Sequence, residues 1–159
     1  MELSDISSVH EAVSRAEKRI CIEGFCGSGK SPLASALSIL PAMCILRVDS
    51  FCRERKGHET FFESIDTASF SSALQVMPQL TIIEGILLRQ IIPENDWNNY
   101  FWIYIKRFSK TGIWHDGLNL SDDPPACWLD GEVMQYHENF RPHEKADIVY
   151  CRSDDAAAE

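Results

Sequence analysis

Short apolar runs alternate with amphipathic segments along most of this chain. The apolar runs are continuous rather than strictly alternating with polar residues, and β-branched and aromatic residues are frequent in them. Both features are typical of strands in a parallel sheet that is covered on both faces. Five runs predict strands, at residues 19–23, 43–49, 80–85, 100–106 and 145–151.

In most of the segments between these runs, apolar residues recur at helical spacing. Helices are expected over residues 4–18, 31–40, 68–80 and 87–96, and near the end of residues 127–140. Asp66 or Thr67 is placed to cap the third of these helices. Strands that alternate with helices predict an α/β fold, in which a parallel sheet lies between two layers of helices.

Polar, aperiodic stretches make up the rest of the chain. Residues 50–67 and 107–126 predict loops, and residues 152–159 predict a polar, frayed tail. A length of 159 residues suits one compact domain, and neither an internal repeat nor a linker divides the sequence. We therefore interpret residues 1–159 as a single domain.

Residues that could bind a ligand gather where the predicted strands end. Parallel sheets bind ligands at the carboxyl ends of their strands. Glu23 with Gly24, Asp49, Glu84 and Lys106 close or follow four of the five predicted strands. These residues are therefore expected to meet at one edge of the sheet.

The first of these strand ends carries a phosphate-binding motif. The stretch GFCGSGKS follows the G-x-x-x-x-G-K-[ST] pattern and lies between a predicted strand and a predicted helix, as the motif requires. In such loops, backbone N–H groups cradle phosphate oxygens at the N-terminus of the helix. Lys30 would reach the β- and γ-phosphates, and the Ser31 hydroxyl would ligate Mg²⁺. The residues expected to bind the nucleotide are Gly24, Gly27, Ser28, Gly29, Lys30 and Ser31.

Two acids at strand ends fit phosphoryl transfer. Glu84 ends an apolar strand, where an acid that helps to hold Mg²⁺ is expected. Its alternative interpretation is a capping or surface acid. Asp49 could accept the proton of a substrate hydroxyl if it lies within hydrogen-bond reach, and its alternative is an Asp that forms a turn.

Four stretches, in this order, resemble the uridine kinase branch of the P-loop kinases: GFCGSGKS, VDSF, IIEGILL and YHENFRPHEKADIVY. This branch includes phosphoribulokinase, pantothenate kinase and nicotinamide riboside kinase, and the resemblance covers residues 20–150. It implies a three-layer P-loop NTPase fold with a five-stranded parallel sheet of order 2-3-1-4-5. It also implies phosphorylation of a small-molecule hydroxyl with ATP and Mg²⁺.

The resemblance also implies roles for individual residues. Asp49 matches the family's acceptor-activating acid and Phe51 its aromatic neighbour, so both are expected to contact the substrate. Glu84 matches the acid of the family's E-G pair after the third strand. Arg141 lies in a segment similar to one near the family's acceptor pocket, and its alternative is a surface Arg packed on a neighbouring aromatic side chain.

Some features depart from the family's pattern. Ser50 and Cys52 stand where the family often has a second acid and a second aromatic residue. The usual Arg-rich lid after the fourth strand is replaced by KRFSKT, in which Arg107 is expected to stabilise the transferring phosphoryl group. Lys lacks the forked geometry with which Arg clamps a phosphate. The chain is also shorter than most members of the family.

Composition narrows the class of partner. The formal net charge of −9 and the pI near 5.0 argue against nucleic acid, because proteins that bind its backbone carry basic faces. The sequence shows neither an apolar run of membrane-spanning length nor a signal peptide. None of the six cysteines forms a C-x-x-C pair. We expect a reduced, cytoplasmic protein that acts on a small molecule and binds neither nucleic acid nor a membrane.

The function expected from these observations is transfer of a phosphoryl group from ATP, with Mg²⁺, to a small-molecule hydroxyl. Nucleosides and ribosides are the first candidates, and Asp49, Lys30 and Arg107 are the expected catalytic residues. One alternative is a nucleotide-binding switch or degraded kinase that transfers nothing, and another is an NTP hydrolase that acts on a partner. The sequence identifies neither the acceptor nor the oligomeric state.

Overall fold

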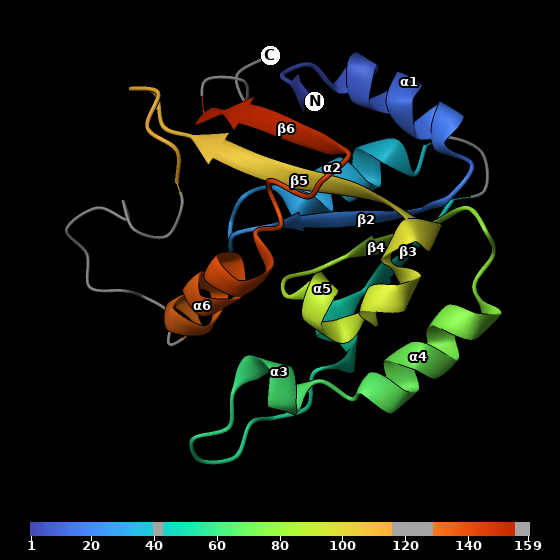
Figure 1. Cartoon of the computed structure of the whole chain (residues 1–159), viewed down its shortest axis with the longest axis vertical. Helices are drawn as coiled ribbons and strands as arrows, with labels where there is room; N and C mark the ends of the chain where they lie inside the picture. Colours follow the sequence, from blue (N-terminus) through green and yellow to red (C-terminus); the bar gives the residue numbers. More distant parts are fainter. Residues whose placement is uncertain (40–42, 116–128, 155–159) are drawn as a thin grey trace.

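Within the described part of the chain, six parallel strands form one sheet. The computed structural model describes residues 1–39, 43–115 and 129–154. The strand order is β1-β6-β5-β2-β4-β3, and the arrowheads of β2, β5 and β6 point the same way in Figure 1. The strands are β1 (Glu2–Leu3), β2 (Arg19–Gly24), β3 (Cys44–Arg47), β4 (Thr81–Glu84), β5 (Tyr100–Phe108) and β6 (Ile148–Ser153).

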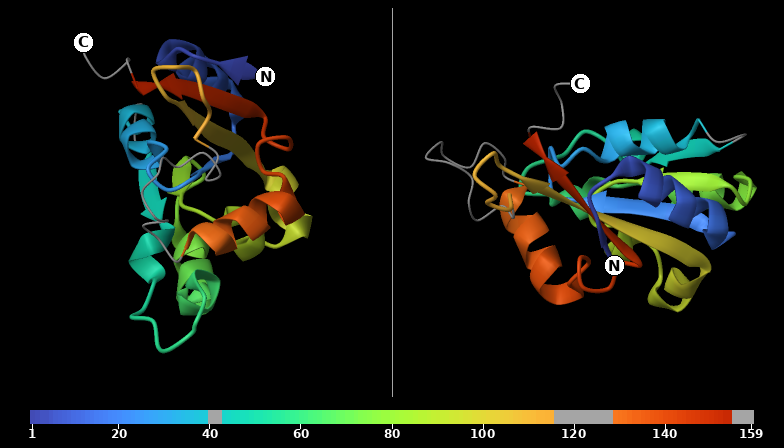
Figure 2. Two further views of the ribbon diagram at one scale, coloured as in Figure 1. Left: turned by 90° about the vertical axis from the view of Figure 1, so that its left-hand side faces the viewer. Right: turned by 90° about the horizontal axis from the view of Figure 1, so that it is seen from above.

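Helices connect the strands and cover both faces of the sheet. Figures 1 and 2 show α1 on one side of the sheet, and α4, α5 and α6 on the other. None of the described helices is both long and apolar enough to cross a membrane. The α-helices are α1 (Ile6–Ala16), α2 (Lys30–Leu37), α3 (Phe61–Ser64), α4 (Thr67–Val76), α5 (Leu88–Ile91) and α6 (Asp130–Phe140), and the 3₁₀ helices are η1 (Val48–Phe51) and η2 (Glu94–Asn99).

The sheet divides the core into two apolar layers. On one face, Val13 of α1 and Leu37 of α2 pack against the strands. On the other face, Phe70 of α4 belongs to a second buried cluster. Side chains alternate along β2, so Ile22 belongs to the first layer and Cys21 to the second. The core therefore fixes which face each residue of β2 occupies up to the phosphate-binding motif.

The predicted fold class and strand order are confirmed. The five predicted strands lie in the order 2-3-1-4-5, as β3, β4, β2, β5 and β6. The sheet has one strand more than the predicted five, because β1 pairs with β6 at its outer edge. This strand contains only two residues. It is too short to show any hydrophobic period, which explains why the sequence did not reveal it.

The carboxyl-terminal strand begins and ends later in the chain than the predicted residues 145–151. β6 runs to Ser153, so Arg152 and Ser153 belong to the sheet and not to a frayed tail that begins at residue 152. Pairing with β5 accounts for the extension, since Arg107 lies beside Arg152 in the register of the two strands. The rest of the predicted tail, residues 155–159, lies outside the described residues.

A short helix interrupts the predicted loop over residues 50–67. α3 begins after Thr60, whose side chain accepts from the Glu63 backbone N–H while the Glu63 side chain accepts from the Thr60 N–H. This capping box satisfies two backbone donors that a helix N-terminus would otherwise leave unpaired. Asp66 caps α4, as expected, by accepting from the Ser69 N–H.

Candidate active site

The phosphate-binding motif forms the turn between β2 and α2, at the carboxyl edge of the sheet. The Ser28 N–H closes the turn on the Phe25 carbonyl oxygen at 3.1 Å. Gly29 caps α2 with a φ of 103°, which favours glycine. A Cβ on Gly24 would lie 2.6 Å from the Ser28 hydroxyl oxygen, and one on Gly29 would collide with the Arg152 guanidinium. Close packing therefore requires Gly24, whose Cβ would also lie 2.9 Å from the Ile105 carbonyl oxygen, whereas the positive φ favours glycine at position 29.

Lys30 begins α2, and its side chain folds back over the loop. Its Nζ donates to the carbonyl oxygens of Gly24 and Phe25, at 3.1 and 2.9 Å. Burial lowers the pKa of Lys30, and the charges of nearby acids, including Glu84 and Asp49, act in the opposite direction. The ammonium group is thus held at the loop, beside two acids.

A hydroxyl group and a carboxylate meet at the first turn of α2. Ser31 Oγ donates to Glu84 Oε2 at 3.0 Å, and Glu84 Oε1 accepts from Arg47 Nε at 2.9 Å. Glu84 and Arg47 end the neighbouring strands β4 and β3 in register, and the Glu84 side chain is only 5% exposed. Mg²⁺ takes oxygen ligands of this kind. Ser31 and Glu84 therefore fit a Mg²⁺ ion, held directly or through water.

The Asp49 carboxylate lies in the same cavity as these groups. Asp49 follows β3 in η1 and is exposed. No group of the described chain donates a hydrogen bond to its carboxylate. This carboxylate is therefore open to a hydroxyl donor from outside the protein. The cavity measures about 500 Å³, and its lining includes Lys30, Ser31, Asp49, Phe61, Glu84 and Arg152.

On the other face of β2, Glu23 lies in a buried polar group with Tyr136 and Arg89. Tyr136 OH donates to Glu23 Oε2 at 2.7 Å and accepts from the Arg89 backbone N–H at 3.1 Å. Arg89 Nε is 3.5 Å from Glu23 Oε1, and each of these two side chains is 3% exposed. The Arg89 guanidinium also lies over the Trp102 ring, 4.0 Å from its centre. This group joins the residue before the loop to α5 and α6.

Burial is the main influence on the pKa of Glu23. It raises the pKa of Glu23 to about 7, although the charge of Arg89 and the hydrogen bond from Tyr136 act in the opposite direction. Glu23 is thus sealed from solvent and differs from Glu84 and Asp49, which share the open cavity.

Two arginines approach the loop from the side of β5 and β6. Arg107 donates from Nη1 to the Gly27 carbonyl oxygen at 3.2 Å and from Nε to Asp154 Oδ1 at 2.6 Å. The hydrogen bond from Arg107 lowers the pKa of Asp154. Arg152 is the neighbour of Arg107 across the two strands and lies against Gly29. Two guanidinium groups therefore border the loop, where they could balance the charge of bound phosphates.

An aromatic group packs on the side of the loop that faces α6. The Phe25 ring stacks on the His137 imidazole, with 4.0 Å between centroids and 8° between planes. His137 Nδ1 lies 2.7 Å from the Val133 carbonyl oxygen, so Nδ1 carries the proton and Tyr104 OH donates to Nε2 at 2.8 Å. Burial lowers the pKa of His137 to about 4. The imidazole is therefore neutral at neutral pH and serves as part of an aromatic wall.

Two residues predicted to bind substrate lie apart from this cavity. The Phe51 ring packs edge-on against Phe70 in the core, with 5.5 Å between centroids. Arg141 is the exposed residue that caps the carboxyl end of α6. Its Nη1 lies 3.6 Å from Glu144 Oε2. It lines a separate hollow that includes Phe25. The structure thus brings together the loop, both strand-end acids and Arg107, and it leaves Phe51 and Arg141 apart from them.

The sequence pointed to neither Arg47 nor Arg152 as part of the site, and it marked the buried Glu23 only as a residue at the end of the first predicted strand. Register could have identified Arg47, because it ends the strand next to Glu84 and pairs with it directly. An acid inside an apolar strand was the signal for Glu23, since side-chain alternation directs it to the face opposite Ile22. Arg152 gave no signal, because a polar tail was expected from that position.

Comparison with known proteins supports the fold. Among solved structures, this chain is similar to one described as a possible uridine kinase from Bacillus stearothermophilus, with a TM-score of 0.62 and 17% sequence identity. The similarity covers 91% of this chain and 96% of that chain. No protein-family model matches the chain, and no curated protein matches it. The chain therefore shares the fold of that structure, an α/β fold built on one parallel sheet.

Proposed function

We propose that this protein is a kinase that uses ATP and Mg²⁺ to phosphorylate a hydroxyl of a small molecule. Nucleosides and ribosides are the first acceptors to test. The proposal rests on the one cavity that Asp49 shares with Lys30, Ser31 and Glu84. A phosphate-binding loop alone would suit any NTPase. An open carboxylate beside the loop is the group that a hydroxyl acceptor needs in addition.

The donor half of the reaction uses groups already at the loop. Lys30 donates two hydrogen bonds to carbonyl oxygens of the loop, and these keep its ammonium group beside the loop. In loops of this kind the lysine contacts the β- and γ-phosphates. Arg107 and Arg152 add positive charge on the far side of the loop. Mg²⁺ bound by Ser31 and Glu84 would supply further charge neutralisation for the phosphates.

Asp49 carries the acceptor half of the proposal. A substrate hydroxyl that donates to this carboxylate would be oriented within the cavity that contains Lys30. As the hydroxyl oxygen forms its bond to the γ-phosphorus, its proton passes to Asp49 and the bond from that phosphorus to the ADP oxygen breaks. The open state of the carboxylate is essential here, because an acid already engaged in hydrogen bonds would be a poorer acceptor.

A wide hollow that includes Thr60, the residue before Phe61 of the cavity, offers room for part of an acceptor. It measures about 990 Å³ and lies between the segment 55–60 and α6. Glu132 of α6 accepts from the backbone N–H groups of Phe61 and Phe62, at 2.7 and 2.9 Å, and so joins the helix to this segment. Such polar lining suits a nucleoside or riboside. The polar residues of the hollow include His58, Glu59, Gln90, Glu132, Gln135 and Asn139.

A nucleotide-binding switch that transfers nothing is the second candidate. It is favoured by the position of Arg107, whose guanidinium is bound to Asp154 and to the Gly27 carbonyl oxygen. A guanidinium held in this way is less available to a transferring phosphoryl group. A switch would bind the nucleotide tightly and show no acceptor turnover.

An acceptor panel distinguishes these two functions. Purified protein with ATP and Mg²⁺ is assayed against nucleosides, ribosides, sugars and pantothenate, and transfer to one of them well above ATP hydrolysis is expected. Tight ATP binding without transfer to any acceptor would favour the switch.

Substitution of Asp49 tests its role directly. Asp49→Asn is expected to lower kcat about 10²- to 10⁴-fold. Nucleotide affinity and stability should hardly change, because the carboxylate accepts no hydrogen bond from the described chain. Ser50→Ala, at the exposed neighbouring position, is the matched control. Full activity of Asp49→Asn would overturn the assignment of this residue as the base.

A further inference from the structure

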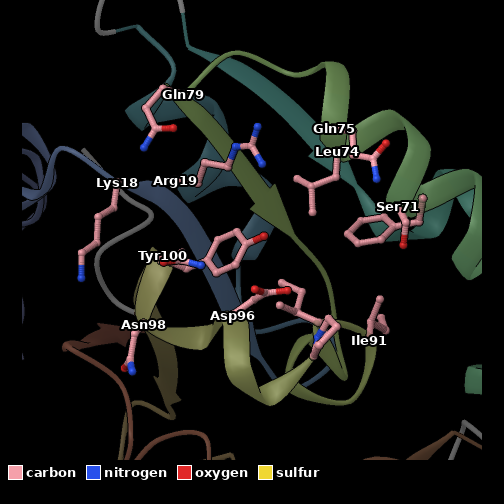
Figure 3. A pocket seen from close by; sticks show the side chains of 14 residues that line it. Lys18, Arg19, Ser71, Leu74, Gln75, Gln79, Ile91, Asp96, Asn98 and Tyr100 are labelled. Carbon is pink, nitrogen blue, oxygen red and sulfur yellow. The ribbon is translucent and has the colours of Figure 1, made fainter.

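A further hollow lies at the opposite edge of the sheet, where the strands begin (Figure 3). It measures about 640 Å³, which is within the range of small-molecule sites. Its walls come from the amino ends of β2 and β5, from α4, and from the segment of α5 and η2. Arg19 begins β2 and Gly24 ends it, so the strand separates this hollow from the phosphate loop by roughly 16 Å. The hollow is therefore distinct from the candidate active site.

One wall of the hollow is apolar and well packed. Phe70 and Ile92 are each only 2% exposed and form its base. Leu74 of α4 and Ile91 of α5 extend the apolar surface. In Figure 3, Leu74 and the Tyr100 ring point into the hollow from different sides. This wall suits a compact apolar body, such as a ring.

Arg19 brings an incompletely paired positive charge to this wall. Its Nη2 donates to the Met77 carbonyl oxygen at 2.8 Å. Its Nε is buried without a hydrogen-bond partner in the described part of the chain. No described carboxylate lies within 4.0 Å of the guanidinium. Arg19 as a whole is partly exposed, but an N–H donor that is buried without a partner is costly, and a bound anion could accept from it.

The neighbouring groups define the kind of anion. Tyr100 is 7% exposed, and burial raises the pKa of its phenol, so the hydroxyl keeps its proton and can donate. Asp96 is exposed at the rim of the hollow, below Tyr100 in Figure 3. Its carboxylate would repel a second negative charge on a ligand. Lys18 also lines the hollow, so the charged lining residues are two cations and one anion, and an anion with a single charge would balance them.

We propose that this hollow is a second small-molecule site, for a ligand with a compact apolar body and one carboxylate group. The carboxylate would meet Arg19 and Tyr100, and the apolar body would cover Leu74 and Phe70. The site is independent of the proposed kinase activity, because its lining shares no residue with the cavity of the phosphate loop.

Titration of the ¹⁵N-labelled full chain, followed by NMR, tests this proposal with three probes of similar shape. The probes are 3-phenylpropionate, 3-phenylpropanol and 2-phenylethyl phosphate. The carboxylate is expected to bind at least about tenfold more tightly than the neutral alcohol, because a charged hydrogen bond is added to the same apolar contact. It should also bind more tightly than the phosphate, whose second charge meets Asp96. The changes in backbone amide chemical shift should be largest at residues 18–19, 70–75 and 91–100.

Two variants with a control separate binding from folding. Arg19→Gln should abolish the preference for the carboxylate, whereas Arg15→Gln, at a position on α1 that is 75% exposed, should preserve it. Ser71→Trp fills the hollow from an exposed lining position and should prevent binding of all three probes without altering Arg19. Equal affinities for carboxylate and alcohol would overturn the proposal. So would unchanged binding in Ser71→Trp, shifts at the phosphate loop alone, or no saturable binding of any probe.

Discussion

The two sides of the phosphate loop differ in their access to solvent and in how their acids are held. Towards β4 and β3, Glu84 and the exposed Asp49 line an open cavity together with Lys30. Towards α6, Glu23 is sealed with Tyr136 and Arg89 and is 3% exposed. All three acids lie close to the loop, yet only those of the open side can meet a substrate. A place on the cavity lining, rather than proximity to the loop, therefore separates these acids, because Glu84 is itself buried and paired with Arg47 yet lines the cavity.

Removal of the Lys30 ammonium should damage the open side most. Lys30→Met is expected to lower kcat about 10³-fold, because a preorganised charge next to the phosphates is lost. Stability should change little, since the lost partners are only two loop carbonyl oxygens. Turnover with ATP and the best acceptor is measured beside thermal unfolding. Near-native turnover would mean that other groups, such as Arg107, balance the nucleotide's charge.

Glu84→Gln tests the contrast between the acids of the open cavity and the buried Glu23. It removes the negative charge of Glu84 and keeps the shape of the side chain. It is expected to weaken Mg²⁺-dependent nucleotide binding about 10- to 100-fold, because Glu84 fits the metal together with Ser31. Calorimetry of an ATP analogue with and without Mg²⁺ measures this effect. An equal loss in the absence of Mg²⁺ would argue against a role in holding the metal.

Because Glu23 is buried, the stability of the protein is expected to depend on pH. Burial raises the pKa of Glu23 from 4.5 to about 7, so the folded chain binds this proton more tightly than the unfolded chain does. The wild type therefore loses stability as the pH rises through this range, and Glu23→Gln, which does not titrate, lacks that loss. The unfolding free energy of the variant relative to the wild type should rise with pH by up to roughly 3 kcal/mol.

Urea unfolding of both proteins at several pH values across this range measures that difference. Other acids titrate in both proteins and cancel in the comparison. A difference that did not change with pH would mean that Arg89 keeps Glu23 ionised throughout, and the sealed side would then resemble the open one.

Arg47→Gln should have the smallest effect of these changes. The Arg47 side chain is 47% exposed, so its ion pair with Glu84 contributes less than about 1 kcal/mol to stability. Nucleotide affinity should stay within a few-fold of the wild type, because Ser31 still donates to Glu84. Chemical denaturation and calorimetry check both expectations. A large loss of affinity would make Arg47 part of the binding site.

Local patterns predicted most of the fold and the donor half of the site. The five longer strands are continuous apolar runs, and the loop motif is contiguous in sequence, so both could be recognised without tertiary contacts. β1, with two residues, could not be recognised. Partners that meet across strands, such as Arg47 with Glu84 and Arg107 with Arg152, depend on strand register.

The aromatic residues after β3 show a further limit of sequence analysis. Phe51 and Phe61 both lie in a polar stretch, and sequence alone does not say which one faces the cavity. In the structure, Phe51 ends η1 and packs into the core, whereas Phe61 begins α3 and lines the cavity. The direction of a side chain after a turn is decided by the packing of the whole domain.

The two residues of β1 protect an edge of the sheet. They pair with Val149 and Tyr150 of β6, and the Val149 N–H donates to the Met1 carbonyl oxygen at 2.8 Å. A bare edge strand is a template for the edge of another molecule. β6 also carries Arg152, whose guanidinium lies against Gly29 of the phosphate loop. Displacement of β1 would therefore expose the unpaired backbone groups of β6 and disturb the phosphate loop at the same time. Self-association of the protein and weakened nucleotide binding would then appear together.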